Sequence, residues 1–235
     1  MPPEASVPRM RLETTVNGRP VVLDIEPREM LLDLLRDRLD LTGTKRSCDT
    51  QVCGACTVLL DGAPVSACCT LAYEAGGRTV ETIEGLASAA GLHPIQQAFV
   101  DQGAIQCGFC TPGFVLATKA LLAENPQPTR AEIASWLGGN LCRCTGYWNI
   151  LDAVEEAAER LAAHPHLNSS PNSDLAGGGM TRKTAVLRQT SPSPVPDGPG
   201  ALWAAVGVRA NAANTVPRPG PRSRTSGENA QGQAP

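Results

Sequence analysis

The chain has 235 residues, is 42% apolar and 18% charged, and carries a formal net charge of −3. This slightly acidic balance, with few aromatic residues, argues against a general nucleic-acid binder. No apolar run reaches the roughly 18–20 residues that a membrane-spanning helix needs, and the first ten residues lack the apolar core of a secretion signal. We therefore expect a cytoplasmic protein with no membrane span, whose most informative feature is its nine cysteines.

The pattern of residues 10–83 predicts strands around one helix. Two β-rich runs within residues 11–25 flank Asn17-Gly18, a pair that favours a tight type I′ turn. Strands followed by one helix and then by more strands indicate a small α+β domain with a sheet, and not a βαβ nucleotide-binding fold. The other elements expected here are a helix over Leu31–Leu39 and strands at Thr57–Leu60, from Val65 onward, and near Arg78–Ile83.

Residues 85–163 change to a helical pattern. Pro94 suits the first turn of one helix, and Thr111-Pro112 opens a second. Thr129 and Glu132 form a capping box for a third helix. A fourth helix is expected over Ile150–Leu161, so this part predicts a compact four-helix domain.

The last part of the chain, residues 165–235, has a different composition. Proline and glycine make up 19 of its 71 residues, a share typical of disordered segments. We predict a disordered tail. Its excess of seven basic over three acidic residues leaves a partner-docking arm as the alternative.

Four cysteines of the first domain are spaced as ligands of a plant-type 2Fe–2S cluster. Cys48, Cys53 and Cys56 have the spacing C-x4-C-x2-C on one loop, and Cys68 follows across a predicted hairpin. A loop around an anionic cluster must turn tightly and point backbone N–H groups at sulfur. Gly54, between two ligands, would let the main chain approach closely.

Four more cysteines form a second set in the helical region. Cys107 and Cys110 make C-x2-C before the helix opened by Pro112, and Cys142 and Cys144 make C-x-C after the third helix. Ligands at helix ends suit an anionic cluster, because N-terminal amides and the helix dipole favour negative charge there. The eight cysteines therefore sort into two four-ligand sites, one in each half of the fold.

Other uses of these residues stay open at this point. Zinc also takes four thiolates and would fit the second set alone, whereas disulfides are disfavoured because nothing indicates an oxidising compartment. The three histidines lie outside the cysteine groups, which excludes a Rieske site, and His93 before Pro94 is interpreted as a structural or capping residue. Cys69, the ninth cysteine, should point away from the cluster bound by Cys68, because adjacent strand residues face opposite ways.

The strings CDTQVCGACTVLLDG, IQCGFCTPGF and GNLCRCTGYWNI resemble the iron–sulfur small subunit of the molybdenum hydroxylase family. That family includes xanthine dehydrogenase, aldehyde oxidoreductases and aerobic carbon monoxide dehydrogenase, and the Cys-Asp-Thr-x-x-Cys form resembles the carbon monoxide dehydrogenase type. The resemblance runs from about Leu12 to Leu161 and does not cover the tail. Many members have glycine where this chain has Gln51, so Gln51 is expected to be strained if the loop needs a positive φ.

The resemblance implies a plant-ferredoxin-like β-grasp domain at residues 10–83 and a helical 2Fe–2S-binding domain at residues 85–163. It implies that the second cluster faces the molybdopterin cofactor of a large subunit, with Gln106 and Cys144 in contact with the pterin. The first cluster would face an FAD-binding medium subunit. Electrons released at molybdenum would pass to the helical-domain cluster, then to the plant-type cluster, then to FAD.

Three functions are compatible with the residues. The favoured one is an electron-transfer subunit of a molybdenum-containing dehydrogenase, assembled as a dimer of heterotrimers, with the substrate site on a partner subunit and no catalytic residue in this chain. A free two-cluster ferredoxin is the second. A cysteine-rich interaction module that holds zinc is the third.

Overall fold

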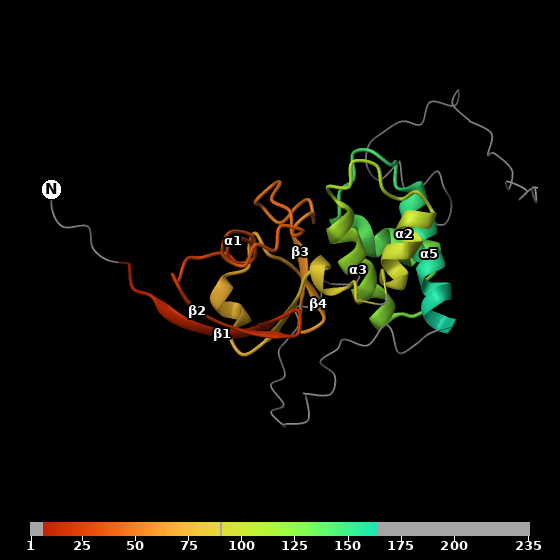
Figure 1. The fold of residues 1–235 in the computed structure, drawn as a ribbon. Coiled ribbons are helices and arrows are strands. Elements are labelled where there is room, and N and C mark those ends of the chain that lie inside the picture. Colours follow the sequence, from red (N-terminus) through yellow and green to blue (C-terminus); the bar gives the residue numbers. More distant parts are fainter. Residues whose placement is uncertain (1–6, 90, 164–235) are drawn as a thin grey trace, which may run out of the picture. The chain divides into compact units, whose positions relative to one another are not determined.

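The computed structural model describes residues 7–89 and 91–163 (Figure 1). The chain divides into two units, Met1–Gly179 and Met180–Pro235, and every described residue belongs to the first. The tail that the sequence predicts to be disordered, residues 165–235, therefore lies outside the described residues. Within the described part, a mixed β-sheet is followed by helices, in agreement with the predicted α+β class.

The described chain starts with a β-hairpin. Strand β1 (Met10–Val16) pairs antiparallel with β2 (Arg19–Ile25). Both turn residues have a positive φ, 50° at Asn17 and 75° at Gly18, as a type I′ turn requires. The predicted hairpin and its turn are confirmed.

Three shorter strands complete a five-stranded sheet in the order β2-β1-β5-β3-β4. Strands β3 (Thr57–Leu60) and β4 (Ala63–Ser66) form a second antiparallel hairpin through Asp61-Gly62. Strand β5 (Thr79–Glu81) lies between the two hairpins, parallel to β1 and antiparallel to β3. Because β5 returns to the centre of the sheet, it joins the two hairpins into one structure.

A leucine-rich helical segment packs on the sheet. Helix α1 (Leu31–Asp33) continues into the π-helical turn η1 (Leu34–Arg38), which closes with the Leu39 N–H donating to the Leu34 carbonyl at 3.1 Å. The predicted helix is thus confirmed, with a wide last turn. Its fully buried residues, which belong to the apolar core of the sheet, are Leu31, Leu32, Leu34 and Leu35. Two short 3-10 turns, η2 (Ala72–Ala75) and η3 (Ile83–Gly85), lie on either side of β5.

The second half of the described chain is helical, and α2, α3 and α5 lie together in Figure 1. The helices are α2 (Pro94–Asp101), α3 (Thr111–Glu124), α4 (Arg130–Trp136) and α5 (Trp148–Ala163), with the 3-10 turn η4 (Leu137–Gly139) after α4. Thr129 and Glu132 form the predicted capping box of α4. Among the described residues, no helix has both the length and the apolar character needed to span a membrane.

Helix α3 is buried on all sides, not along a single stripe. Every residue from Gly113 to Leu122 is buried. The reason is that α3 packs against β3 as well as against α2 and α4. An enclosed helix needs no polar face, so its sequence shows little amphipathic periodicity.

Strand β3 separates two apolar cores, and all four of its residues are buried. Val58 and Leu60 belong to the core of the sheet, whereas Leu59 belongs to the core of the helices, together with Phe114. Alternate residues of a strand face opposite sides, so β3 is shared by both cores. It thereby fixes the loop that precedes it, which carries three cysteines, against the helices.

Candidate metal centres

The first cysteine group lies on the loop before β3 and on the turn after β4. The Cys48 Sγ accepts hydrogen bonds from the backbone N–H groups of Thr50 and Cys53, each at 3.4 Å. Hydrogen bonding, first of all from the Thr50 backbone, lowers the pKa of Cys48 to about 6. The loop therefore points N–H groups at sulfur, as predicted, and favours the thiolate form that a metal ligand needs.

Cys56 and Cys68 are the buried members of this group, with exposed fractions of 2% and 8%. The Ala67 N–H donates to the Cys56 carbonyl at 3.2 Å, which holds the two segments together. Burial raises the pKa of Cys56 to about 12, and its thiol is hydrogen-bonded to Cys68. A metal bound here would have to displace the Cys56 proton, because only the thiolate is a ligand.

The prediction that Cys69 points away from the cluster bound by Cys68 rests on strand alternation, which the structure does not show at these two residues. Both residues lie in the turn that follows β4, so the alternation of side chains along a strand does not apply to them. Their Sγ atoms are 3.7 Å apart. Two thiolates bound at about 2.3 Å to one tetrahedral metal are also about 3.7 Å apart. Cys69 is exposed whereas Cys68 is buried, so burial favours Cys68 as the protected ligand.

The loop of the first group contains two non-glycine residues in the left-handed region. Gln51 has φ 62° and Asp49 has φ 53°. A side chain at such a position costs about 1 kcal/mol. Gln51 therefore has the positive φ at which the sequence analysis expects strain.

The second cysteine group lies at the start of α3 and on the loop between η4 and α5. Cys110 is the N-cap residue of α3, as its place before Thr111-Pro112 predicts. The Sγ atoms of Cys107 and Cys144 lie 3.6 Å apart, and the Cys110 thiol is hydrogen-bonded to Cys142. The structure therefore brings these four side chains together in two pairs.

The thiols of the second group differ in their tendency to ionise. Burial raises the pKa of Cys110 to about 12, and the hydrogen bond with Cys107 raises the pKa of Cys144. Burial also acts to raise the pKa of Cys142, but hydrogen bonds, chiefly from Thr145, outweigh it and leave that pKa below its ordinary value. Cys142 therefore favours the thiolate form more than Cys110 or Cys144 does before any metal binds.

The paired arrangement fits a 2Fe–2S cluster. Within residues 7–89 and 91–163, no group of three or more histidine, cysteine or acidic side chains converges to hold a single metal ion. Such convergence is not needed for this cluster, because each iron takes two protein thiolates and two bridging sulfides. The 3.6 Å separation of the Cys107 and Cys144 sulfurs is that of two thiolates on one tetrahedral metal, about 3.7 Å.

Hydrogen bonds join the two loops that carry the cysteine groups. The Leu141 N–H donates to the Cys53 carbonyl at 2.9 Å, and the buried Asn140 side chain donates to the Gly54 carbonyl at 3.0 Å. A Cβ atom on Gly54 would lie 2.5 Å from the Gly139 carbonyl oxygen. Gly54 therefore permits close approach of the main chain, as predicted, but the neighbour that approaches is the loop of the other cysteine group.

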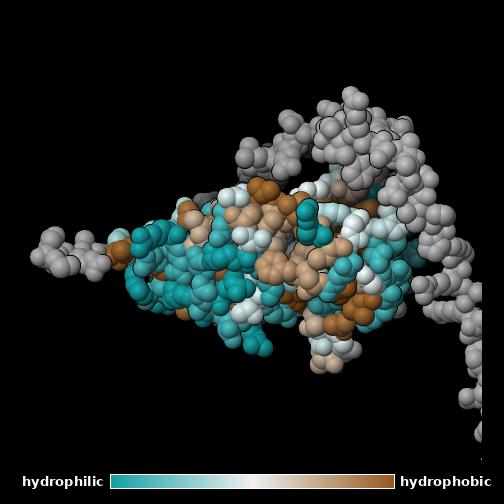
Figure 2. Space-filling model, turned by 90° about the horizontal axis from the view of Figure 1, so that it is seen from above, coloured by the Kyte–Doolittle hydropathy of each residue, from teal (hydrophilic) through white to brown (hydrophobic). Residues whose placement is uncertain are grey.

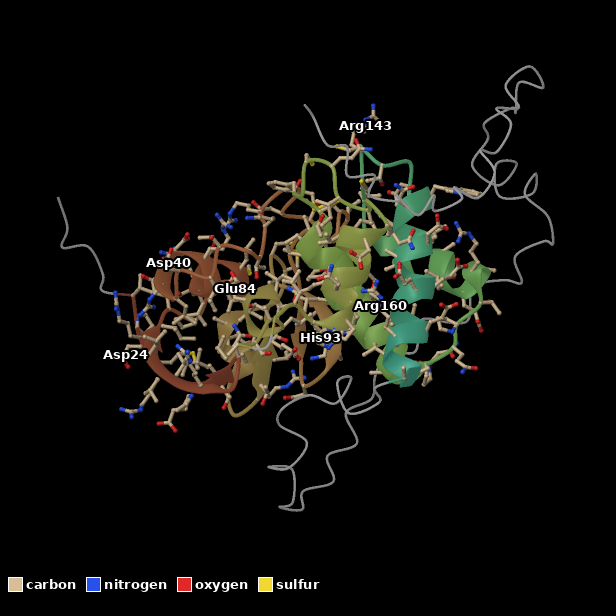
Figure 3. The ribbon with its side chains drawn as sticks, turned by 45° about the vertical axis from the view of Figure 1, so that its right-hand side comes forward. Asp24, Asp40, Glu84, His93, Arg143 and Arg160 are labelled. Carbon is tan, nitrogen blue, oxygen red and sulfur yellow. The ribbon has the colours of Figure 1, made fainter. Side chains whose placement is uncertain are left out.

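The surface around the second group is exposed and partly apolar. Gln106, Cys107 and Cys144 are all exposed. Arg143 lies at the outer end of its loop and points away from the helices (Figure 3). Apolar residues reach the surface of the described part, as the brown areas of Figure 2 show. The exposed large apolar side chains next to cysteines of this group are Ile105, Phe109 and Leu141, together with Trp148 at the start of α5.

His93 is a helix cap, as interpreted from the sequence. Its Nδ1 accepts the Ile95 N–H at 3.3 Å, and its own N–H donates to the Gln96 side chain at 3.0 Å.

Two residues of the site region were missed by the sequence reasoning. The sequence signal for Asn140 was only its position two residues before Cys142. The signal for Lys119 was only its charge within an otherwise apolar helix.

Two family models match this chain. The 2Fe-2S iron-sulfur cluster binding domain matches residues 14–80, and the [2Fe-2S] binding domain matches residues 82–155. The chain is 48% identical over 149 residues to the nicotine 6-hydroxylase small subunit of Paenarthrobacter nicotinovorans, covering 63% of this chain and 90% of that one. It is 47% identical over 154 residues to the nicotinate dehydrogenase small FeS subunit of Eubacterium barkeri, covering 66% and 98%.

Solved structures agree with these relatives. A chain of quinoline 2-oxidoreductase from Pseudomonas putida 86 matches with a TM-score of 0.64 and 47% identity, covering 66% of this chain and 98% of that one. The aldehyde oxidoreductase of Desulfovibrio gigas matches with a TM-score of 0.64 and 41% identity. There the alignment covers 71% of this chain but only 18% of the larger protein.

The fold and the two matched domains define an iron–sulfur protein with a ferredoxin-type part followed by a helical 2Fe–2S-binding part. Within that class, the chain belongs to the family of small iron–sulfur subunits of the molybdenum hydroxylases. The resemblance read from the cysteine motifs is therefore confirmed. The relatives named here are subunits of oxidoreductase enzymes.

Proposed function

We propose that this chain carries electrons from the molybdopterin site of a large partner subunit to the FAD of a medium partner subunit. The first four cysteines, Cys48, Cys53, Cys56 and Cys68, would hold the plant-type cluster, and Cys107, Cys110, Cys142 and Cys144 would hold the second. When bound, the two clusters would supply one-electron steps between two sites that exchange electrons in pairs. The protein would fix the distance between them and limit their contact with water.

The hydrogen bond from Leu141 to Cys53 is the observation that carries this proposal. Leu141 directly precedes Cys142, and its N–H donates to the carbonyl of Cys53, a ligand of the other group, at 2.9 Å. The main chain therefore connects one ligand of each group through a single hydrogen bond. Electron tunnelling weakens steeply with distance, so a direct and rigid connection of this kind is what transfer between two clusters requires.

The exposure of each group supports contact with a partner subunit on both sides, and the family resemblance suggests which partner lies on which side. Cys107 and Cys144 are exposed, and so are the apolar residues Phe109 and Leu141, which are two and three positions from them in the sequence; exposed apolar residues of this kind suit burial by a partner protein. This side would face the large subunit, with Gln106 and Cys144 in contact with the pterin. The loop of Cys48, where Val52 is 61% exposed, would face the FAD subunit. The substrate would then be chosen by the large subunit, and the full assembly would be a dimer of heterotrimers.

The composition of the full chain gives the first test. We expect about four iron and four sulfide per chain, with two distinct paramagnetic signals after reduction. A single signal, or zinc in place of iron, would overturn the two-cluster assignment and favour the zinc-module alternative. Elution of the native protein as a monomer, free of large partners, would instead favour a free ferredoxin.

The order of transfer is tested in the purified complex with variants that lack one cluster each. Without the plant-type cluster, substrate should still reduce the helical-domain cluster, while FAD stays oxidised on the same timescale. Without the helical-domain cluster, the plant-type cluster should stay oxidised as well. Rapid-freeze spectroscopy after substrate addition distinguishes these outcomes, and normal reduction of the plant-type cluster in the second variant would contradict the order.

A further inference from the structure

The residue that follows the C-x-C motif, Thr145, makes two contacts with one sulfur atom of the second group. Its backbone N–H donates to the Cys142 Sγ at 3.4 Å, and its Oγ1 lies 3.1 Å from the same sulfur. The first contact belongs to the main chain and would persist with almost any side chain. The second depends on the hydroxyl, which among the standard amino acids at this position only threonine or serine would supply in the same place.

The ionisation state of Cys142 decides the direction of the hydroxyl contact. The Thr145 Oγ1 accepts the Tyr147 N–H at 3.1 Å. A hydroxyl has one proton to donate, whereas a cysteine thiolate bound to a metal has none and can only accept. The Tyr147 N–H leaves the Thr145 proton free, so with Cys142 bound to iron as a thiolate the contact would be an O–H···S hydrogen bond donated by Thr145.

Tyr147 holds this arrangement in place. Its hydroxyl accepts the Cys142 N–H at 2.9 Å, and its ring packs edge-to-face on Phe114, with 6.1 Å between the centroids. Its backbone has φ 69°, an unfavourable value for a bulky residue. Such a conformation persists only where the surroundings over-determine it, and the contacts of Tyr147 hold the turn that presents Thr145 to the sulfur.

We propose that the Thr145 hydroxyl sets the reduction potential of the helical-domain cluster. The inference rests on the proposed function, because it takes Cys142 as an iron ligand. Reduction adds one negative charge to the cluster, and a hydrogen bond to a ligand sulfur stabilises that added charge. The reduced form is therefore favoured, and the potential is higher than it would be without the hydroxyl. This favours electron transfer from the molybdenum side onto this cluster.

The test is a redox titration of the full chain loaded with iron and sulfide, in which the two paramagnetic signals are followed separately. Thr145→Val removes the hydroxyl and keeps the shape of the side chain. The reduction potential of its helical-domain cluster should be lower than in the wild-type chain. A tenfold change in this one-electron equilibrium corresponds to about 59 mV, and we expect a shift up to that size. The plant-type cluster is an internal control that should not change, and Thr145→Ser should restore the wild-type value.

Each other outcome decides against the proposal. An unchanged potential in Thr145→Val would show that the hydroxyl does not act on the cluster, and equal shifts of both clusters would indicate a general effect. If Thr145→Val does not assemble the second cluster, Thr145→Ala gives the same test without the branched methyl groups. Loss of the cluster in both, with assembly in Thr145→Ser, would assign Thr145 a structural role. Absence of the second cluster from the wild-type chain would contradict the proposed function instead.

Discussion

The ammonium group of Lys119 on α3 forms an ion pair with the carboxylate of Glu81 on β5, and both side chains are largely buried, at 6% and 10% exposure. The pair connects the helices to the sheet at the same junction where β3 faces both cores. Removing one partner of a buried pair leaves an uncompensated charge, whereas removing both does not. The pair therefore links α3 to β5 of the sheet, whatever its net contribution to stability.

Lys119→Met should destabilise the full chain by about 3–5 kcal/mol, because the buried Glu81 carboxylate loses the positive charge that faces it. The double variant Lys119→Met/Glu81→Leu should recover most of this loss. Urea unfolding followed by circular dichroism measures both free energies. Arg11→Met, in the exposed pair with Glu13, is the control and should cost no more than about 1 kcal/mol. Equal losses in the single and double variants would contradict this account.

The neighbouring sulfurs of Cys68 and Cys69 give a second prediction. Cys69→Ser should leave the iron content unchanged, whereas Cys68→Ser should lose or distort the plant-type cluster, because Cys68 is the buried thiol next to Cys56. With the two sulfurs 3.7 Å apart, any cluster that remains in Cys68→Ser should depend on Cys69. The variant lacking both thiols should then lose it completely. Iron analysis and visible spectra provide the measurement. Equal damage from the two single variants would mean that the fourth ligand is wrongly assigned.

The sequence predicted what depends on local pattern and spacing. The Asn17-Gly18 turn, the capping box at Thr129 and the cap at His93 are short-range features, and each is confirmed. The alternation expected at Cys68 and Cys69 fails because β4 ends at Ser66, whereas the sequence pattern sets no end to the strand that it predicts from Val65 onward. The bridge from Asn140 to Gly54 joins residues that are 86 positions apart. Contacts of that kind depend on how the two halves pack together.

The backbone of Gln51 gives a third prediction. Gln51→Gly should stabilise the chain, because it removes the cost of a side chain at φ 62°, about 1 kcal/mol. Part of this gain is offset by the greater freedom of glycine in the unfolded chain, about 0.4–1 kcal/mol. A small net gain in the free energy of unfolding is therefore expected. Gln51→Ala keeps the Cβ atom and should show no gain, so equal values for the glycine and alanine variants would show that the loop is not strained here.

The contact between Gly113 and Gly54 gives the last prediction. A Cβ atom on Gly113 would lie 2.2 Å from the Gly54 carbonyl oxygen. That oxygen belongs to the main chain, so it cannot move aside as the end of a flexible side chain can. Gly113→Ala should therefore push the first turn of α3 away from the cysteine loop. Overpacking of this kind costs about 1–3 kcal/mol. Alanine has a higher helix propensity than glycine, by about 1 kcal/mol. A net loss of stability would therefore come from the clash with Gly54 and not from a change in helix propensity.

Gly138→Ala is the matched control, since a Cβ atom there meets nothing within 4 Å. It should leave the free energy of unfolding nearly unchanged. The same two variants can be compared by the magnetic interaction between the two reduced clusters in the full chain. Because Gly113 lies in the α3 turn next to Cys110, and Gly54 lies between Cys53 and Cys56, Gly113→Ala should weaken that interaction. An unaltered interaction and unaltered stability in Gly113→Ala would show that this glycine contact does not set the spacing of the two cysteine groups.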